Sequence, residues 1–384
     1  MTKKFDVVII GAGSVGVPAA YAMSREGLKV AVIDEMPSTG QGQNKRAIGG
    51  IRATHTNPAK IHLCQDTINI ISTWEKKYGT DIEWFQGGYA FVAYNEDHEK
   101  LMKENLVIQK QAGLNIDWIN ENKMSNLVPG INQDGLIGGT YSPEDGNASP
   151  LKTIHAIEKQ SKIQGTEYLL KETVTDIQIQ NRIIKKVITN KNEYETDYVI
   201  NAAGAYAREI GGMVGIDIPV YPDSHESGIS EPVKKFIDPL VVDLRAGEGS
   251  ENFYFYQNKE GKFILCLTPD PLIPGTNVNE TSAFLPQVAR RLINLIPRTK
   301  YLKMRRTWRG LYPMTHDGSP IVGKVKGLEG YINAVGMCGQ GFMIGPGLGQ
   351  LLSRMVLEKI SKQDETILEE LSFYRNFGKV EKLK

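Results

Sequence analysis

This sequence has few cysteines, almost no excess of one charge over the other, and no long apolar run. Its 384 residues hold only Cys64, Cys266 and Cys338, without a CxxC spacing, which argues against a zinc knuckle or an iron–sulfur cluster and favours a reducing compartment. With 45 basic and 44 acidic residues the formal net charge is +1, so no global field attracts nucleic acid or anionic lipid. No apolar run reaches the roughly twenty residues of a membrane span, and residues 1–6 leave no room for a signal peptide. We therefore expect a cytoplasmic protein with no metal site, no nucleic-acid partner and no transmembrane segment.

What the sequence does have is a glycine-rich turn between two buried strands near its start. Four branched apolar residues, 7–10, predict a strand buried on both faces, and the glycines follow at once. Gly11 permits a tight turn, Gly13 lets backbone amides approach a pyrophosphate, and Gly16 lets the next helix pack closely on the strand. That helix is expected over residues 17–25, with its positive N-terminal end toward the turn.

A second strand is predicted over residues 29–33, and an acidic residue follows it at the same edge of the sheet. Asp34 is placed there to accept hydrogen bonds from ribose hydroxyls, with Glu35 as the alternative, and no arginine replaces it to favour a 2′-phosphate. Ser14 and Val15 complete the turn between the glycines. A lone GxGxxG is weak evidence, but strand, glycines, helix, strand and acid in this order predict a dinucleotide site.

The polar, glycine-rich segment after Asp34 is too long to be a simple turn, and such loops are usually functional. Its last part places Arg46 and Arg52 around the pair Gly49-Gly50, which would let backbone lie against something flat. The alternative is a surface loop with two solvated arginines.

Two later segments repeat the pattern of a strand that opens into small residues. The strand 198–201 is followed by Ala203 and Gly204, where the alternative is small residues chosen for helix–strand packing. Near the end, dense glycine precedes a terminal helix predicted over 348–359, whose N-terminus would point at a ligand and stabilise developing negative charge.

Periodicity predicts the remaining elements. Helices are expected over 58–78, over part of 95–120, over 151–162 after the cap Ser149, and over 284–296. Strands are expected as a pair within 82–94, at 137–141, and as a small meander over 168–173, 174–181, 183–190 and 194–197. Strands within 219–267 should join the 82–94 pair in one antiparallel sheet, and residues 379–384 should form a solvated tail.

The chain resembles the D-amino-acid-oxidase-like flavoproteins, the group with sarcosine oxidase, glycine oxidase and the dye-linked L-proline dehydrogenase catalytic subunit. The resemblance covers nearly the whole chain and rests on residues 11–34, 49–52, 201–204, His225 with 229–232, 314–323 and 339–342. It implies FAD rather than NAD, and an α/β fold with a Rossmann-like FAD-binding domain of the GR2 type. That domain would comprise residues 1–82, 145–215 and 300–384, and an inserted antiparallel β-sheet substrate domain flanked by helices would comprise 83–144 and 216–299.

The resemblance also assigns site residues. The cofactor-binding set is Gly11, Gly13, Ser14, Val15, Gly16, Asp34, Glu35, Arg46, Gly49, Gly50, Ile51, Val174, Ala203, Gly204, Gly310, Gly339, Gln340, Gly341, Phe342 and Met343. The candidate catalytic set is Arg52, His225, Tyr254, Tyr312 and Met343.

Departures from the family pattern limit what carries over. Gly310 aligns with the cysteine that bonds FAD in monomeric sarcosine oxidase, so non-covalent FAD is expected. Met343 and Tyr312 stand where relatives carry a carboxylate-binding lysine or arginine, which leaves Arg52 as the main candidate for that role. Leu265 aligns with an oxygen-activating lysine, and Lys262 should face the other side of its strand, so oxygen is not expected to be the acceptor.

The function implied is a flavin-dependent dehydrogenase or oxidase of a small amino acid or N-substituted amino acid, such as proline, sarcosine or glycine. Hydride would pass to flavin N5 and leave an imine. A dye, a quinone or a partner subunit would take the electrons. The alternatives are a 2-hydroxy acid or glycerol phosphate dehydrogenase, a flavin-binding subunit without turnover, and a nicotinamide-dependent dehydrogenase that would leave the later glycine-rich segments unused.

Overall fold

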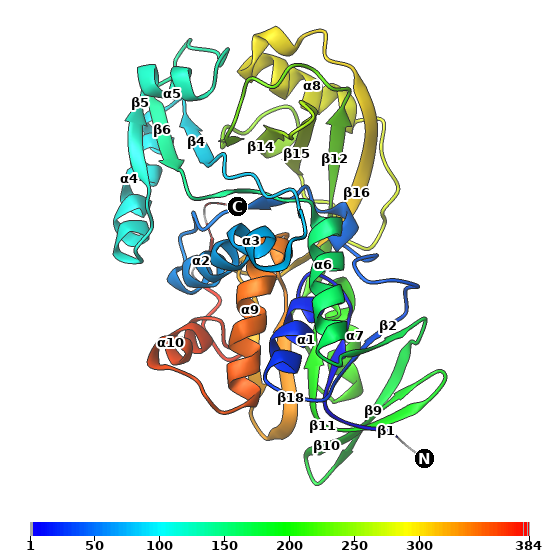
Figure 1. Ribbon diagram of the computed structural model, residues 1–384. Coiled ribbons are helices and arrows are strands. Elements are labelled where there is room, and N and C mark those ends of the chain that lie inside the picture. The colour runs from blue at the N-terminus through cyan, green and yellow to red at the C-terminus, as the bar shows by residue number, and fades with distance from the viewer. Residues whose placement is uncertain (1–2, 379, 382, 384) are drawn as a thin grey trace.

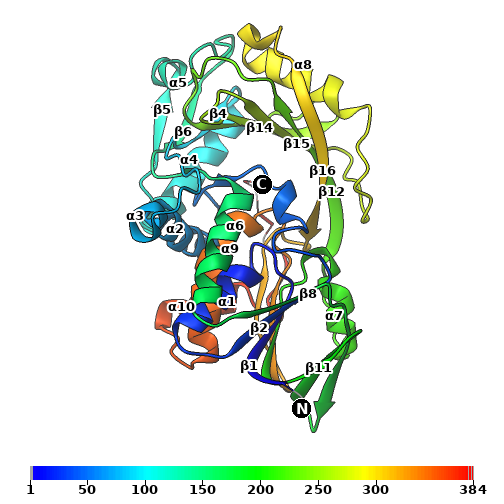
Figure 2. The same cartoon turned by 45° about the vertical axis from the view of Figure 1, so that its right-hand side comes forward.

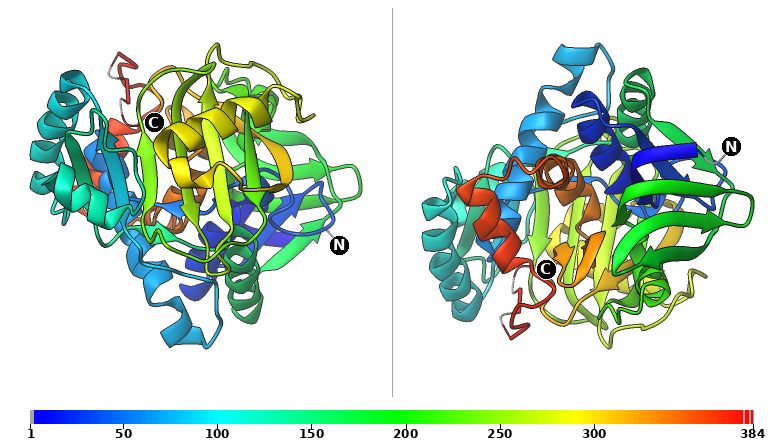
Figure 3. Two further views of the ribbon diagram at one scale, coloured as in Figure 1. Left: turned by 90° about the horizontal axis from the view of Figure 1, so that it is seen from above. Right: turned by 90° about the horizontal axis from the view of Figure 1, so that it is seen from below.

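The computed structural model describes residues 3–378, 380, 381 and 383, and the chain forms two halves, each built on one large sheet. In Figure 1 the half that contains the N-terminal strand lies below, and the half that carries α8 lies above. Figure 3, seen from above, shows α8 crossing the strands of the upper sheet. The chain passes between the halves repeatedly, so segments far apart in sequence meet where they face each other.

The lower sheet has a parallel centre, as four consecutive buried apolar residues in its first strand predict. Its strand order is β17-β18-β10-β11-β1-β2-β8, and β9 pairs with β10. Strands β8, β2, β1, β11 and β18 run parallel, whereas β9 and β17 pair antiparallel with their neighbours. The bounds are β1 Lys3–Ile10, β2 Val30–Asp34, β8 Glu167–Leu170, β9 Val174–Gln180, β10 Ile183–Thr189, β11 Glu193–Asn201, β17 Ile321–Val325 and β18 Leu328–Val335.

Four long helices, together with Trp74 and Ile367 from two shorter ones, share one core with one face of this sheet, and α7 (Ala207–Met213) packs on the other face (Figure 2). The four are α1 Gly16–Arg25, α2 Pro58–Ser72, α6 Pro150–Ile163 and α9 Gly341–Val356. Helix α9 approaches α1 closely because it presents glycine there: a Cβ on Gly345 would lie 1.8 Å from the carbonyl oxygen of Ser14. This contact holds the turn after β1 against the start of α9.

The upper sheet has the order β16-β12-β15-β14-β13-β4-β6-β5. Its outer face packs against α8 through Phe253, Phe255 and Phe263, and its inner face looks toward the lower half. The bounds are β4 Tyr89–Ala93, β5 Asp117–Asn120, β6 Gly138–Ser142, β12 Tyr221–Ser230, β13 Leu240–Asp243, β14 Ser250–Gln257, β15 Phe263–Pro269, β16 Met304–Met314 and α8 Phe284–Leu295. The remaining elements are β3 Gly50–Ile51, β7 Gly146–Asn147, α3 Trp74–Tyr78, α4 Glu96–Gln111, α5 Glu121–Leu127, α10 Lys362–Glu370 and the short 3-10 turns η1 Asn44–Arg46, η2 Gly204–Tyr206 and η3 Pro297–Thr299.

Several predicted elements differ in the structure. The helix predicted over 58–78 is two helices, α2 and α3, divided at Thr73. The strand pair predicted within 82–94 is the single strand β4, and Phe85 forms only an isolated bridge with Asn147. The predicted meander is not one unit, because β8 pairs in parallel with β2 and β11 runs unbroken through 193–201. The upper sheet is antiparallel except where β13 pairs in parallel with β4.

The C-terminal region also differs. The predicted terminal helix starts earlier, at Gly341, and α10 follows it. Residues 379, 382 and 384 of the predicted solvated tail lie outside the described residues, but Glu381 and Leu383 are each 2% exposed. A tail of this composition is normally solvated; here a buried partner for Glu381, described below, holds that side chain inside. The predicted domain division stays a prediction, although β16, assigned to the cofactor domain, pairs with β12 in the upper sheet.

Candidate active site

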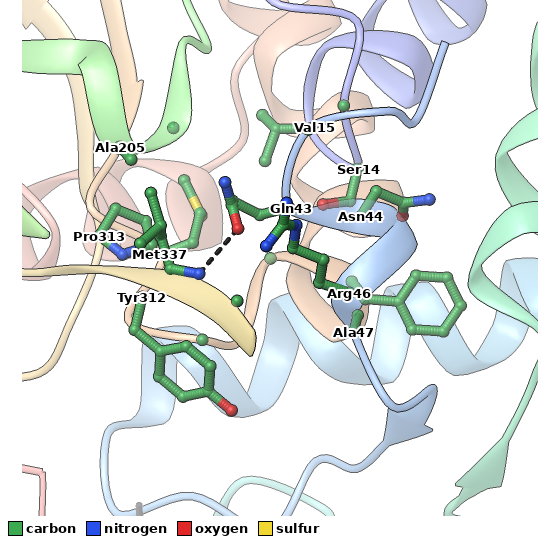
Figure 4. A pocket seen from close by; sticks show the side chains of 18 of the residues that line it. Ser14, Val15, Gln43, Asn44, Arg46, Ala47, Ala205, Tyr312, Pro313 and Met337 are labelled. Atoms are coloured by element: carbon green, nitrogen blue, oxygen red, sulfur yellow. Dashed lines mark hydrogen bonds between the residues drawn. The ribbon is translucent and has the colours of Figure 1, made fainter. Parts of the chain in front are cut away.

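One cavity of about 710 Å³ lies between the two halves, a size typical of small-molecule sites. Its walls come from the turn after β1, the loop between β2 and β3, the inner face of the upper sheet, and the segment before α9. Figure 4 shows Ser14, Val15 and Arg46 on one side of it and Tyr312 and Met337 on another. All predicted site residues line this cavity except Gly16 and Ile51.

Geometry explains the glycines of the first turn. Gly11 has φ +108°, and a Cβ there would lie 2.4 Å from the carbonyl oxygen of Ala202, the residue after β11. A Cβ on Gly16 would lie 1.9 Å from the carbonyl oxygen of Gly11, so this glycine serves the close approach of α1 rather than a ligand. A Cβ on Gly13 would meet no atom within 4 Å, and Gly13 faces the cavity, which leaves room for a pyrophosphate to approach its backbone.

Asp34 stands at the carboxyl end of β2, on the cavity wall. One carboxylate oxygen accepts the Ala12 amide at 2.6 Å and the other accepts the Met36 amide at 2.8 Å. These bonds fix the carboxylate beside the glycine turn and leave each oxygen further lone pairs for hydroxyl donors. Contact with a ribose stays a prediction for Asp34.

The loop before β3 is fastened to β16 of the upper sheet. The Gln43 side chain accepts the Leu311 amide at 2.7 Å, the dashed contact in Figure 4. Trp308 Nε1 donates to the Arg46 carbonyl at 2.8 Å, and the Arg46 guanidinium donates to the Arg309 carbonyl. Arg46 is therefore not a solvated surface arginine. Sequence reasoning missed Gln43, although its glycine-rich surroundings were the available signal.

The chain alternates along β3 and into the residue after it, so Gly50 and Arg52 line the cavity while the Ile51 side chain is buried in the helix-covered core. Contact of Ile51 with the cofactor stays a prediction. Gly50 has no room for a side chain, because a Cβ would lie 2.2 Å from the Tyr89 hydroxyl.

The segment before α9 brings a helix N-terminus to the cavity. Gly339 has φ +80°, and a Cβ there would lie 2.2 Å from the ring of Tyr312. Helix α9 begins at Gly341 with no acidic residue in its first turn. The Gln340 side-chain oxygen is buried without a hydrogen-bond partner among the described residues. Free amides and an unused polar side chain at this place suit a ligand rich in hydrogen-bonding groups.

The upper wall carries a cluster of aromatic and imidazole groups. The hydroxyl oxygens of Tyr254 and Tyr312 are hydrogen-bonded at 2.9 Å. The His225 ring stacks on Tyr312 with centroids 3.7 Å apart and planes 13° from parallel. Burial raises the pKa of both tyrosine hydroxyls well above the ordinary value, so both stay neutral donors.

Arg52 is 5% exposed and is held by backbone carbonyls. Its Nη2 donates to the Leu383 carbonyl at 2.5 Å, and its Nη1 donates to the Thr54 carbonyl. The C-terminal segment is held there by Glu381, whose carboxylate accepts from Lys60 Nζ at 2.8 Å with both side chains fully buried. Arg52 thus reaches the cavity wall from a position that depends on residues more than three hundred positions away in sequence.

The alignment of Leu265 with an oxygen-activating lysine fails on geometry. Leu265 is buried in the outer core with α8, whereas Ile264 and Cys266 belong to the inner face and Thr268 lines the cavity. None of these three carries a charge, so β15 presents no cation toward the cavity. Lys262 donates to Glu260 at the turn before β15 and does not line the cavity.

The residues present fit an FAD-sized ligand. The cavity joins an unobstructed glycine turn, an acid at the end of β2 and a helix N-terminus to one polar aromatic wall. Among the described residues, no group of three or more His, Cys, Asp or Glu side chains is arranged to hold a metal ion. Likewise, no helix in the described part of the chain is long and apolar enough to cross a membrane.

Comparison with known families gives one match over most of the chain. A family model described as FAD dependent oxidoreductase (DAO) matches residues 6–355. Sarcosine dehydrogenase of Mus musculus mitochondria is 24% identical over 383 residues, covering 94% of this chain but 40% of the relative. This chain therefore spans less than half of that protein. Hydrogen cyanide synthase subunit HcnC of Pseudomonas aeruginosa is 25% identical over 402 residues, covering 94% of each chain.

Solved structures give the same fold. The structure of L-proline dehydrogenase from P. horikoshii superposes with a TM-score of 0.91 at 30% identity, covering 98% of both chains. Glycine oxidase from Bacillus cereus superposes with a TM-score of 0.83 at 22% identity, covering 97% of this chain and 99% of that one. At that lower identity the likeness shows the fold alone.

Proposed function

Because the chain belongs to the DAO family of FAD-dependent oxidoreductases, we propose that it oxidises the C–N bond of a small amino acid or N-substituted amino acid. FAD, when bound, supplies the hydride acceptor for the carbon next to nitrogen, and the product is an imine. The name of one structural relative, L-proline dehydrogenase, supports this substrate class. Proline-, sarcosine- and glycine-like amino acids are the candidates.

The observation that carries the proposal is that one cavity joins the glycine turn to a wall bearing Arg52, His225, Tyr254 and Tyr312. A guanidinium can grip a carboxylate with two parallel hydrogen bonds. Arg52 would bind the substrate carboxylate once its Nη2 no longer donates a hydrogen bond to the Leu383 carbonyl. The neutral tyrosine hydroxyls and the imidazole then offer hydrogen bonds to the polar part of the substrate, and Met343 adds an apolar contact.

The cofactor is expected to be non-covalent, since Gly310 has no nucleophile. A Cβ at Gly310 would already lie 3.0 Å from Cβ of Arg46, so a cysteine there would need local rearrangement. Acid precipitation checks this expectation, because a non-covalent flavin stays in the supernatant.

Anaerobic reduction of the flavin tests the substrate class. Proline, sarcosine, glycine, D-amino acids and 2-hydroxy acids would each be mixed with the FAD-loaded protein, and flavin absorbance followed. We expect bleaching by one of the nitrogen compounds and none by its 2-hydroxy analogue. Bleaching by 2-hydroxy acids alone would make the protein a C–O dehydrogenase, and no bleaching by any compound would favour a flavin-binding subunit without turnover.

We further propose that a dye, a quinone or a partner subunit, rather than oxygen, accepts the electrons. The inner face of β15 offers Ile264, Cys266 and Thr268 in place of a cation that would stabilise superoxide. Stopped-flow mixing of substrate-reduced protein with air-saturated buffer should show slow reoxidation beside fast dye reduction under argon. Rapid reoxidation with hydrogen peroxide formed at each turnover would show an oxidase instead.

A further inference from the structure

The start of β12 carries a buried carboxylate that contacts two different parts of the cavity wall. Asp223 Oδ2 lies 3.3 Å from His225 Nε2. Its other oxygen accepts the amides of Ser224 and Ile273, each at 2.8 Å. The side chains of Asp223 and His225 are 6% and 4% exposed. One carboxylate therefore joins an imidazole on the cavity wall to the connection that follows β15.

That connection, residues 270–283, is here called the strap. It contains no helix or strand, its residues are mostly exposed, and it runs beside β12 and β16 (Figure 2). Leu272, Thr276 and Val278 of the strap line the cavity. The strap thus covers part of the cavity although it forms no hydrophobic core of its own.

Buried charged side chains hold the strap at three places. Asp223 accepts a hydrogen bond from the Ile273 amide, and Arg309 Nη1 donates to the Asn279 carbonyl at 3.0 Å. Glu226 accepts both the amide and the hydroxyl of Thr281 at 2.6 Å. Asp223 is the one of these three that also contacts a candidate catalytic group.

The same contact determines where the imidazole carries its proton. Burial would raise the pKa of Asp223, but the hydrogen bonds from His225 and from the Ser224 and Ile273 amides lower it below its usual range. An ionised carboxylate only accepts hydrogen bonds, so His225 Nε2 must carry a hydrogen. His225 Nδ1 is buried and has no partner among the described residues, so a second proton there would lack an acceptor.

We propose that Asp223 is a positioning residue that keeps His225 protonated at Nε2 and fastens the strap over the cavity with the same carboxylate. Nδ1 is left as a buried acceptor that the protein does not use, and an N–H of the amine would reach it only when the side chains that cover it move aside. This role of Nδ1 rests on the proposed oxidation of an amine, whereas the tautomer and the strap contact do not.

Asp223→Asn separates the two roles. The asparagine oxygen can still accept the Ile273 amide, but its NH₂ group would face Nε2, which must then lose its hydrogen to Nδ1. Asp223→Ala removes both contacts. Thr281→Val is the matched control, because it removes one hydrogen bond at the far end of the strap and leaves Asp223 untouched.

Three measurements report on the FAD-loaded protein: ¹⁵N NMR of the imidazole nitrogens, limited proteolysis of the strap, and steady-state kinetics with the amine found in the substrate screen. The chain has 6 histidines, and His225→Gln assigns the resonance. We expect Asp223→Asn to move the hydrogen to Nδ1 and to lower kcat at least about tenfold while strap cleavage stays at the wild-type rate. Asp223→Ala should also accelerate cleavage, and Thr281→Val should accelerate cleavage and raise KM without changing the tautomer or kcat.

An Asp223→Asn protein with the wild-type tautomer and wild-type kcat would overturn the proposal, as would an Asp223→Ala protein whose strap resists cleavage like the wild type. If no amine reduces the wild-type flavin, the proposed function fails by that result alone. The NMR and proteolysis measurements still decide the role of Asp223 in that case.

Discussion

The two walls of the cavity are built in different ways. The wall on the lower half, here called the backbone wall, is rich in glycine and comes from residues 10–50, 202–213 and 334–343. The wall on the upper half consists of side chains from β12, β14 and β16, with Arg52 supported by the C-terminal segment.

This difference determines what each wall tolerates. The backbone wall is sensitive to an added Cβ at Gly11 and Gly49, where a carbonyl oxygen lies 2.4 and 2.3 Å from the place of the new atom, but not at Gly13. A side-chain wall tolerates local changes but depends on contacts made over long sequence distances, such as that of Lys60 with Glu381. If the two walls differ in this way, substitutions on each should have different consequences for stability, cofactor binding and substrate binding.

The largest effect is expected where the upper wall depends on the C-terminal segment. Lys60→Met removes the partner of the buried Glu381 carboxylate, and breaking a buried pair costs about 3–5 kcal/mol. Urea unfolding should show this loss. Lys3→Met is the control: Lys3 pairs with Glu167 with side chains 57% and 39% exposed, so its loss should cost under about 1 kcal/mol.

The pair of Lys60 and Glu381 should also make the stability of the protein depend on pH. Burial would raise the pKa of Glu381, but Lys60 lowers it below the usual range. A lowered folded-state pKa stabilises the protein above the unfolded value of about 4.3, and this contribution is lost as the pH falls further. In Lys60→Met only the Thr56 hydrogen bonds and the charge of Arg52 still oppose burial, so the pKa of Glu381 should rise and the stabilisation above the unfolded value should shrink. A variant as stable as the wild type at pH 7 would show that the C-terminal segment is not held by this pair.

The next effect separates strain from ligand contact within the backbone wall. Gly11→Ala should cost about 3 kcal/mol, because φ is +108° and the new Cβ would lie 2.4 Å from the Ala202 carbonyl. Gly13→Ala meets no atom within 4 Å, so the fold should keep its stability while FAD affinity falls about tenfold or more. Thermal unfolding of the apoprotein and FAD titration distinguish them. Equal losses of stability in both variants would contradict the division.

The backbone wall was predictable from sequence because its signals are local. Glycines placed directly after an apolar strand predict the turn, and Asp34 follows from the length of one helix and one strand. The caps behave likewise: Ser149 accepts the Lys152 amide at the start of α6, as predicted. The fold class, by contrast, was implied by the family resemblance rather than by patterns within single elements.

The side-chain wall could be predicted only in part, because periodicity shows that a strand alternates but not which face meets the cavity. Leu265, aligned with a family lysine, lies in the outer core, and Ile51 points into the core although both its neighbours line the cavity. Glu381 was assigned to a solvated tail because its partner, Lys60, lies far away in sequence. Asp223 had no local signal, since its role comes from a strap that folds back fifty residues later.

The smallest effect is expected from a crossed pair of substitutions, one on each wall. Asp34→Ala should weaken FAD binding by roughly 1–3 kcal/mol through loss of a charged acceptor for ribose hydroxyls, and leave substrate affinity in the reconstituted enzyme unchanged. Arg52→Lys should raise the KM for the amino acid about tenfold, because an ammonium cannot form the two parallel hydrogen bonds of a guanidinium, while FAD binding changes little. FAD titration and steady-state kinetics, each carried out on both variants, give the FAD affinity and the KM of each. If Arg52→Lys instead lost FAD and kept its KM, Arg52 would belong to the cofactor wall, and the division of the cavity into a backbone wall for the nucleotide and a side-chain wall for the substrate would have to be redrawn at β3.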